Sequence, residues 1–182
     1  MTPAISLDIE TLSTRPNAAI ASIGAVRFDP HSDWIGDTFH ANVSLFNCQH
    51  HGLAIDTATV LWWLQQNDAA RARLVAGQQD AMPLLTALEV LAEFIFATAA
   101  EPELWVNGAS FDLPILASAY RAVDLPLPWN YWQERDLRTI KALNKGARID
   151  RAEGIKHNAL YDALYQAQSI RHILQFNPDM DA

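Results

Sequence analysis

Residues 6–12 read SLDIETL, and this stretch decides how the rest of the chain is interpreted. Over residues 4–10 apolar and polar side chains alternate, which predicts a β-strand with one buried face. Asp8 and Glu10 are two positions apart, so both carboxylates leave the same face, about 7 Å apart at the backbone. Two like charges so placed repel each other, and a bound divalent cation would remove that repulsion. An exposed strand face would carry the same pair without a cation, so both interpretations remain open at this point.

Further elements follow on the C-terminal side of this strand. Strands are predicted at Ile20–Phe28, Thr38–Val43 and Leu104–Val106, and short turns between the early strands favour an antiparallel meander. Helices are expected from apolar stripes and capping residues over residues 57–64, 82–97, 111–122, 137–143 and 159–174. Early strands followed by alternating helix and strand predict an α/β fold, with helices covering a mixed sheet.

The composition is that of an ordinary globular protein. The chain has 182 residues, half of them hydrophobic, without repeat or linker, so a single domain over residues 1–182 is expected. No apolar run approaches the roughly 18 residues of a membrane span, and residues 1–10 lack the pattern of a secretory signal. Cys48 is the single cysteine, which excludes an intrachain disulfide and favours a cytoplasmic protein.

The formal net charge of −8 argues at first against a nucleic-acid partner, but the charge is unevenly distributed. Between positions 135 and 156 the basic residues are Arg135, Arg138, Lys141, Lys145, Arg148, Arg151 and Lys156. This basic segment is either a solvated helix face and loop or a local patch that binds phosphates on an otherwise acidic protein.

The segment NGASFDLPIL places a third carboxylate at the start of a helix. Asn107 and Gly108 form a turn, Ser110 is the expected N-cap, and Asp112 falls in the first helical turn. The helix dipole favours a negative charge there, which explains Asp112 even without a function.

The segment HNALYDA places a histidine and a fourth carboxylate at the start of the last helix. If Asn158 caps that helix, His157 lies in the preceding loop and can fold back over Asp162. A single histidine ahead of a helix is usually a surface residue, but the combination with Asp162 is harder to explain in that way.

Taken together, these residues suit phosphodiester hydrolysis. Two divalent ions about 3.5–4 Å apart can activate a water, stabilise the leaving 3′ oxygen and clamp the phosphate between them. Such ions prefer oxygen ligands, and an imidazole can accept the proton of the water near neutral pH. The chain offers one such set, namely Asp8, Glu10, Asp112, Asp162 and His157.

The segments SLDIETL, NGASFD and HNALYDA resemble, in that order, the three motifs of the DEDD exonuclease superfamily. The histidine ahead of the last aspartate is similar to that of the DEDDh branch, which includes RNase T, oligoribonuclease and polymerase proofreading domains. With WWLQQ, WVNGASFD and RDLRTI, the chain most resembles an RNase T-like subgroup of bacteria and phages, described as 3′-5′ exoribonucleases or exonuclease-VIII-like proteins. The resemblance extends from residue 5 to about residue 172.

This resemblance implies a ribonuclease-H-like fold, with a five-stranded mixed sheet flanked by helices. It implies that His157 is the general base and that two Mg²⁺ or Mn²⁺ ions are held by Asp8, Glu10, Asp112 and Asp162. Relatives in this subgroup are often homodimers, so a homodimer is expected by analogy.

The resemblance also implies contacts with the substrate. Thr11 would contact the terminal nucleotide near its 3′-hydroxyl, and Leu12 would pack against the last base. Asn107 and Phe111 are further expected contacts. Asn107 departs from the family pattern, because it stands five residues before Asp112 where many proofreading members have an asparagine four residues before.

Two other groups of residues are candidates for contacts with the nucleic acid. The apolar stripe of Val60, Leu61 and Leu64 assigns Trp63 to the core and leaves Trp62 exposed. The exposed indole could stack on a base or lie in a subunit contact. Asp136 is expected to be a helix N-cap, while Arg135 and Arg138 are the expected phosphate contacts.

The sequence therefore predicts a 3′-5′ exonuclease that uses two divalent ions, acts on single-stranded 3′ ends and releases nucleoside 5′-monophosphates. A preference for RNA or DNA does not follow from these residues. Two alternatives are a ribonuclease-H-type endonuclease, which would share the sheet and the metals, and a noncatalytic nucleic-acid-binding module on the same fold.

Overall fold

The computed structural model describes residues 3–146, 149 and 157–176, with a five-stranded sheet at its centre. In the order β3-β2-β1-β4-β5, the strands are β3 (Ile35–Asn42), β2 (Ile20–Phe28), β1 (Ala4–Thr11), β4 (Glu103–Val106) and β5 (Glu134–Asp136). Strands β1, β2 and β3 pair antiparallel, whereas β4 is parallel to both β1 and β5. The predicted mixed sheet and its antiparallel meander are confirmed.

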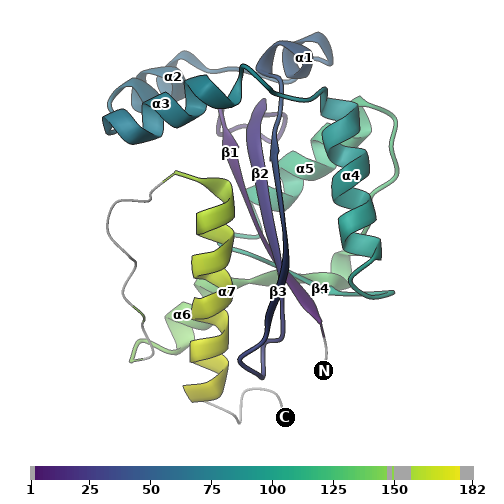
Figure 1. Ribbon diagram of the computed structural model, residues 1–182, viewed down its shortest axis with the longest axis vertical. Helices are drawn as coiled ribbons and strands as arrows, with labels where there is room; N and C mark the ends of the chain where they lie inside the picture. The colour runs from purple at the N-terminus through teal and green to yellow at the C-terminus, as the bar shows by residue number, and fades with distance from the viewer. Residues whose placement is uncertain (1–2, 147–148, 150–156, 177–182) are drawn as a thin grey trace.

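The central strand β1 has two different faces. Its apolar side chains point into the main hydrophobic core, which α4 (Leu84–Phe96) and α5 (Asp112–Ala122) complete on one side of the sheet. The side chains of Asp8 and Glu10 leave the other face, which α7 (Ala159–Phe176) covers (Figure 1). The sheet thus separates the carboxylates from the main hydrophobic core.

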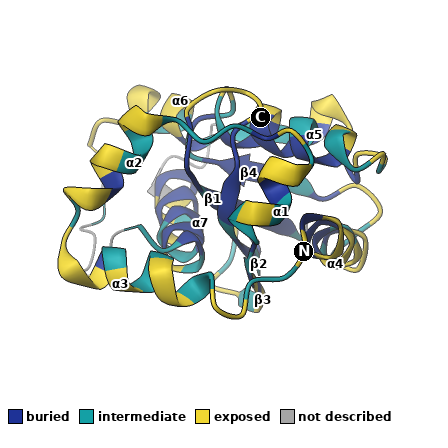
Figure 2. Cartoon of the chain, turned by 90° about the horizontal axis from the view of Figure 1, so that it is seen from above, coloured by how far each residue is buried: buried dark blue, intermediate teal, exposed yellow. Residues whose placement is uncertain are grey.

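Other helices surround the sheet. Near the end of β1 lie α1 (Leu45–His50), α2 (Thr57–Leu64) and α3 (Asp68–Gly77), whereas α6 (Leu137–Leu143) lies beside α7 (Figure 1). A 3₁₀ turn at Tyr131–Gln133 precedes β5. Seen from above, the strands and the sheet-facing side of α7 are buried, while α2 and α3 carry exposed residues (Figure 2). Within the described ranges, no helix is both long and apolar enough to span a membrane.

The packing of α2 differs from the expectation. Leu61 and Leu64 are 54% and 61% exposed, so the predicted apolar stripe is wrong. Only Trp63 of α2 is buried, because the helix lies over the loop after β1 rather than over the sheet. Trp63 packs there in a small cluster with Leu12, Ala21 and Ala70. The expected exposure of Trp62 is confirmed.

A glycine allows α7 to approach the sheet beside Asp8. Gly24 of β2 pairs with Asp8 in the register of the sheet. A Cβ atom at Gly24 would lie 2.2 Å from the backbone carbon of Ala159, at the start of α7. One turn further on, the Ser6 hydroxyl donates a 2.8 Å hydrogen bond to the carbonyl of Ala163. These two contacts fix where the first turns of α7 cross β1.

Candidate active site

A cavity of about 630 Å³ opens where β1 ends, between residues of β1, α2, α5 and α7. This volume lies within the roughly 300–1,000 Å³ typical of ligand sites. Most of the predicted site residues line it, namely Asp8, Glu10, Thr11, Trp62, Asn107, Phe111, Asp112, Arg138, His157 and Asp162. Of the predicted set, Leu12 and Arg135 are not among the described residues that line this cavity.

Three carboxylates converge in this cavity. Asp8, Glu10 and Asp162 each offer one ligand atom, and these atoms lie within 4.8 Å of one another. Asp8 and Glu10 come from the central strand, whereas Asp162 comes from the first turns of α7. Such an arrangement of oxygen atoms suits a hard divalent cation, which would offset the repulsion among the three groups.

Asp112 lines the same cavity but does not belong to this group of three. Asp112 is 4% exposed, and its carboxylate accepts a hydrogen bond of 3.4 Å from the backbone N–H of Ile9. Burial raises the pKa of Asp112 to about 7, while the Ile9 N–H and the charge of Arg138 act in the opposite direction. The expected N-cap at Ser110 is wrong, because α5 begins after Phe111 without a side-chain cap.

The start of α7 is capped as the sequence predicted. The side chain of Asn158 accepts a hydrogen bond of 3.1 Å from the backbone N–H of Tyr161. In return, the carboxylate of Asp162 accepts one of 3.3 Å from the backbone N–H of Asn158. This reciprocal cap holds Asp162 at the helix start and leaves His157 in the loop immediately before it.

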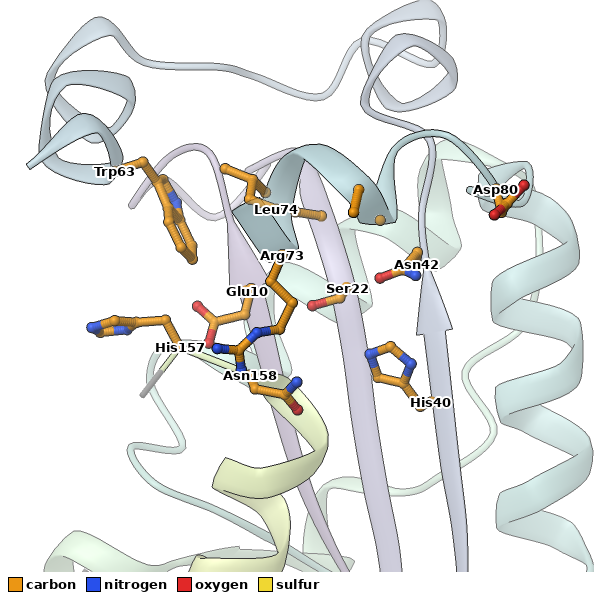
Figure 3. A pocket seen from close by; sticks show the side chains of 13 residues that line it. Glu10, Ser22, His40, Asn42, Trp63, Arg73, Leu74, Asp80, His157 and Asn158 are labelled. Atoms are coloured by element: carbon orange, nitrogen blue, oxygen red, sulfur yellow. The ribbon is translucent and has the colours of Figure 1, made fainter. Parts of the chain in front are cut away.

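His157 lies against α2. Its φ of 57° falls in the left-handed region, which few residues other than glycine adopt. The imidazole centroid is 4.9 Å from the ring of Trp62 and 5.7 Å from that of Trp63. In Figure 3 the imidazole points away from the Glu10 carboxylate. In this conformation the imidazole therefore contacts α2 and does not face Glu10.

Sequence reasoning missed one buried residue of the site. Gln166 lines the cavity, and its side-chain amide donates a 2.7 Å hydrogen bond to Oδ1 of Asp8. Gln166 follows Asp162 by four positions, so the two side chains share one face of α7. This helical spacing was the signal from which Gln166 could have been found.

Thr11 and Leu12, at the end of β1, both contact other residues of the chain. The Thr11 hydroxyl donates to the carbonyl of Ser13 at 2.7 Å, and the Thr11 carbonyl accepts from the indole of Trp63 at 2.9 Å. Leu12 is buried in the cluster around Trp63, so its side chain packs against α2. The structure thus places Leu12 in the core, away from the surface of the cavity where a base could touch it.

The two arginines expected at phosphates occupy different places. The guanidinium of Arg138 lies close to Gly108, and Arg138 lines the cavity. The guanidinium of Arg135 instead donates to Glu103 at 3.0 Å and to the carbonyl of Trp132 at 2.6 Å. Asp136 caps α6, as expected. Arg148, Arg151 and Lys156 of the basic segment lie outside the described residues.

A smaller cavity of about 270 Å³ adjoins the first. Glu10, Trp63 and His157 line both cavities and form the wall between them. In Figure 3 the side chain of Arg73 reaches from α3 into the smaller cavity, toward Glu10 and Asn158 and away from His40. The carboxylate site is therefore open on two sides of His157.

Comparisons with known proteins agree with this geometry. The chain is 27% identical over 162 residues to the exodeoxyribonuclease of Enterobacteria phage T4, covering 75% of this chain and 70% of the phage protein. Its fold is similar to that of E. coli exonuclease I in complex with a dT13 oligonucleotide, with a TM-score of 0.71 and 14% identity. That match covers 100% of this chain but 43% of the other, so the chain spans less than half of exonuclease I.

A second solved structure matches over nearly its whole length. The nuclease domain of 3′hExo, a DEDDh family member bound to rAMP, has a TM-score of 0.66 and 13% identity, over 97% of this chain and 93% of that one. The family model of the 3′-5′ exoribonuclease Rv2179c-like domain matches residues 4–174. The chain therefore belongs to the family of the 3′-5′ exoribonuclease Rv2179c-like domain, and its fold is similar to that of a DEDDh family member, in agreement with the resemblance found in the sequence.

Proposed function

We propose that this chain, as one domain over residues 1–182, hydrolyses the last phosphodiester bond at the 3′ end of a single strand. It would release one nucleoside 5′-monophosphate at a time. The observation that carries this proposal is the convergence of Asp8, Glu10 and Asp162 within 4.8 Å, in a cavity that His157 also lines. Membership of a family of 3′-5′ exonucleases supports the direction of attack.

The donor set fits two divalent cations. All the converging groups are carboxylates, which Mg²⁺ and Mn²⁺ prefer over the softer ligands that select zinc or copper. Asp8, Glu10 and Asp162 would hold the ions, and Asp112 would complete the set from α5. When bound, the ions lower the pKa of a water and neutralise charge on the phosphate and on the leaving 3′ oxygen.

The residues of the chain would move the proton and hold the strand. After the imidazole of His157 turns from α2 toward the carboxylates, one ring nitrogen accepts the proton of the attacking water. Arg138 donates to a phosphate oxygen, while Thr11, Asn107 and Phe111 face the terminal nucleoside.

Leu12 and Arg135 are not part of these proposed contacts. Leu12 packs beneath α2, and the guanidinium of Arg135 is paired with Glu103. Trp62 remains a candidate for stacking on a base, because it lines the cavity and its side chain is partly exposed.

We propose a single-stranded 3′ end as the substrate class, and an experiment has to decide whether that strand is RNA or DNA. The family is described as exoribonuclease, whereas the phage T4 relative is an exodeoxyribonuclease. Likewise, exonuclease I was solved with dT13 and the 3′hExo nuclease domain with rAMP. The rates of digestion of RNA and DNA oligonucleotides of one sequence distinguish the two sugars. Each is tested single-stranded and as a duplex, with Mg²⁺ or Mn²⁺.

The proposal is tested with a 5′-labelled single strand. We expect a ladder that shortens from the 3′ end in Mn²⁺ and disappears in EDTA, and no cutting of a strand whose 3′ end is blocked. Internal cutting of the blocked strand would indicate an endonuclease instead. Binding without any metal-dependent cutting would indicate a noncatalytic module.

Two variants test the assigned roles. His157→Ala should lose most turnover and keep metal binding, whereas Asp8→Ala should lose both. Either variant cutting at the wild-type rate would refute the assignment. The homodimer and the cytoplasmic location remain predictions from the sequence, and light scattering of the purified chain tests the first.

A further inference from the structure

A glutamine is buried where the fold favours apolar side chains. Gln166 is 3% exposed on the face of α7 that packs against the sheet. Its neighbours on that face include Ala163, Ala167 and Ile170, all buried in the core between α7 and the sheet. Burying an amide costs free energy unless both its polar atoms find partners. An apolar residue would therefore suit the packing of α7 better.

One polar atom of Gln166 has a specific partner. Nε2 donates a hydrogen bond of 2.7 Å to Oδ1 of Asp8, across a sequence separation of 158 residues. A carboxylate accepts hydrogen bonds and does not donate them when ionised, so the amide nitrogen must be the atom that faces Asp8. Hydrogen bonds to ionised carboxylates are shorter and stronger than neutral ones.

The other polar atom of Gln166 is left without compensation. Oε1 is buried and accepts no hydrogen bond from any residue that the structure describes. The packing of α7 thus gains nothing from the carbonyl end of this side chain. The contact with Asp8 is what the structure offers to explain a glutamine at this position.

We propose that Gln166 is a positioning residue for the metal ligand Asp8. Its amide holds the carboxylate of Asp8 at one oxygen, in the orientation that brings it within 4.8 Å of Glu10 and Asp162. The same N–H reduces the repulsion that Asp8 meets from the other two carboxylates. Partners of this kind, behind the metal ligands, typically change metal affinity by roughly 10–100-fold when they are removed.

This inference rests on the proposed function, because it presumes that the three carboxylates bind a divalent ion. Its test therefore measures metal binding directly. Electron paramagnetic resonance of free Mn²⁺, titrated against metal-free protein without substrate, gives the dissociation constant of each variant. We expect Gln166→Met, which keeps the length and loses the donor, to weaken Mn²⁺ binding by about 10-fold or more.

A matched control lies two positions further along the same helix. Gln168 is exposed, so Gln168→Met changes the same chemistry away from the site and should bind Mn²⁺ as the wild type does. At saturating Mn²⁺, the KM of Gln166→Met for the oligonucleotide should stay within about twofold of wild type.

Several outcomes would overturn the proposal. Equal Mn²⁺ affinity of wild type and Gln166→Met would do so, as would an equal loss of affinity in the Gln168→Met control. If Gln166→Met does not fold, Gln166→Asn provides the second test, since its shorter amide withdraws from Asp8 and should show the same loss. Failure of the wild type itself to bind Mn²⁺ would instead refute the proposed function.

Discussion

The indole of Trp62 and the imidazole of His157 meet edge to face, with ring centroids 4.9 Å apart and planes at 83°. Trp63 makes a similar contact, and its own indole is fixed by a 2.9 Å hydrogen bond to the Thr11 carbonyl. Edge-to-face contacts at these distances are attractive. A left-handed backbone outside glycine persists only where its surroundings hold it, so these rings stabilise the observed position of His157.

We expect this contact to break when the site is loaded. The NMR signals of the His157 ring should be displaced by the ring current of Trp62 in the free protein. Adding Mg²⁺ together with a nucleoside 5′-monophosphate should reduce that displacement, because the imidazole turns toward the carboxylates. Trp62→Leu should reduce it already in the free protein, whereas Trp132→Leu, on the 3₁₀ turn, should not. Signals that stay unchanged on loading would show that His157 does not move.

Divalent metal should stabilise the folded chain. An ion that binds the native state but not the unfolded state adds stability, about 2.7 kcal/mol at 100 times its dissociation constant. Mn²⁺ should therefore raise the Tm of the wild type in a concentration-dependent way. Asp162→Asn should lose most of this increase, while Asp124→Asn, an exposed control at which asparagine tolerates the positive φ, should keep it. A Tm independent of Mn²⁺ would argue against a metal site.

Replacing Gly24 with alanine should loosen the site and the fold together. The added methyl would lie 2.2 Å from the backbone of Ala159, so α7 has to move away from β2. Overpacking of this kind costs about 1–3 kcal/mol, which urea unfolding measures. The same variant should bind Mn²⁺ more weakly, because Asp162 moves with the helix. Gly146→Ala, with nothing within 4 Å of the added carbon, serves as the control.

Arg138 and Arg135 should behave differently when each is replaced by leucine. Arg138→Leu should raise the KM for the oligonucleotide by roughly 10-fold, the effect of losing one charge-assisted hydrogen bond of about 1.5 kcal/mol. The slope of the logarithm of the binding constant against the logarithm of the salt concentration should also become smaller by about one. Arg135→Leu should leave KM nearly unchanged and lower the stability by up to about 1 kcal/mol, since its partly exposed pair with Glu103 is lost. Similar KM values for both variants would contradict this distinction.

The sequence predicted those parts of the site that depend on local patterns. The alternation around Asp8 and Glu10 predicted a strand with both carboxylates on one face, and the Asn158 cap placed His157 in the loop before α7. The helical spacing placed Gln166 on the same face as Asp162, but its contact with Asp8 depends on the crossing of β1 and α7, which no local pattern predicts.

Surface position was also harder to predict than secondary structure. Arg135 and Arg138 are three positions apart and chemically alike, yet only the pairing of β4 with β5 brings Glu103 next to Arg135. Leu61 and Leu64 follow a helical stripe, but α2 lies at the end of the sheet and has no core to bury them in. Such features depend on where an element is placed, which the helical or strand period does not determine.

The hydrogen bond between Asp8 and Gln166 joins the first strand to the last helix. Ribosomes make the chain from its N-terminus, so Asp8 and Glu10 emerge long before Asp162 does. A polypeptide that ends before α7 lacks Asp162, so the proposed set of metal ligands is complete only after α7 has been made.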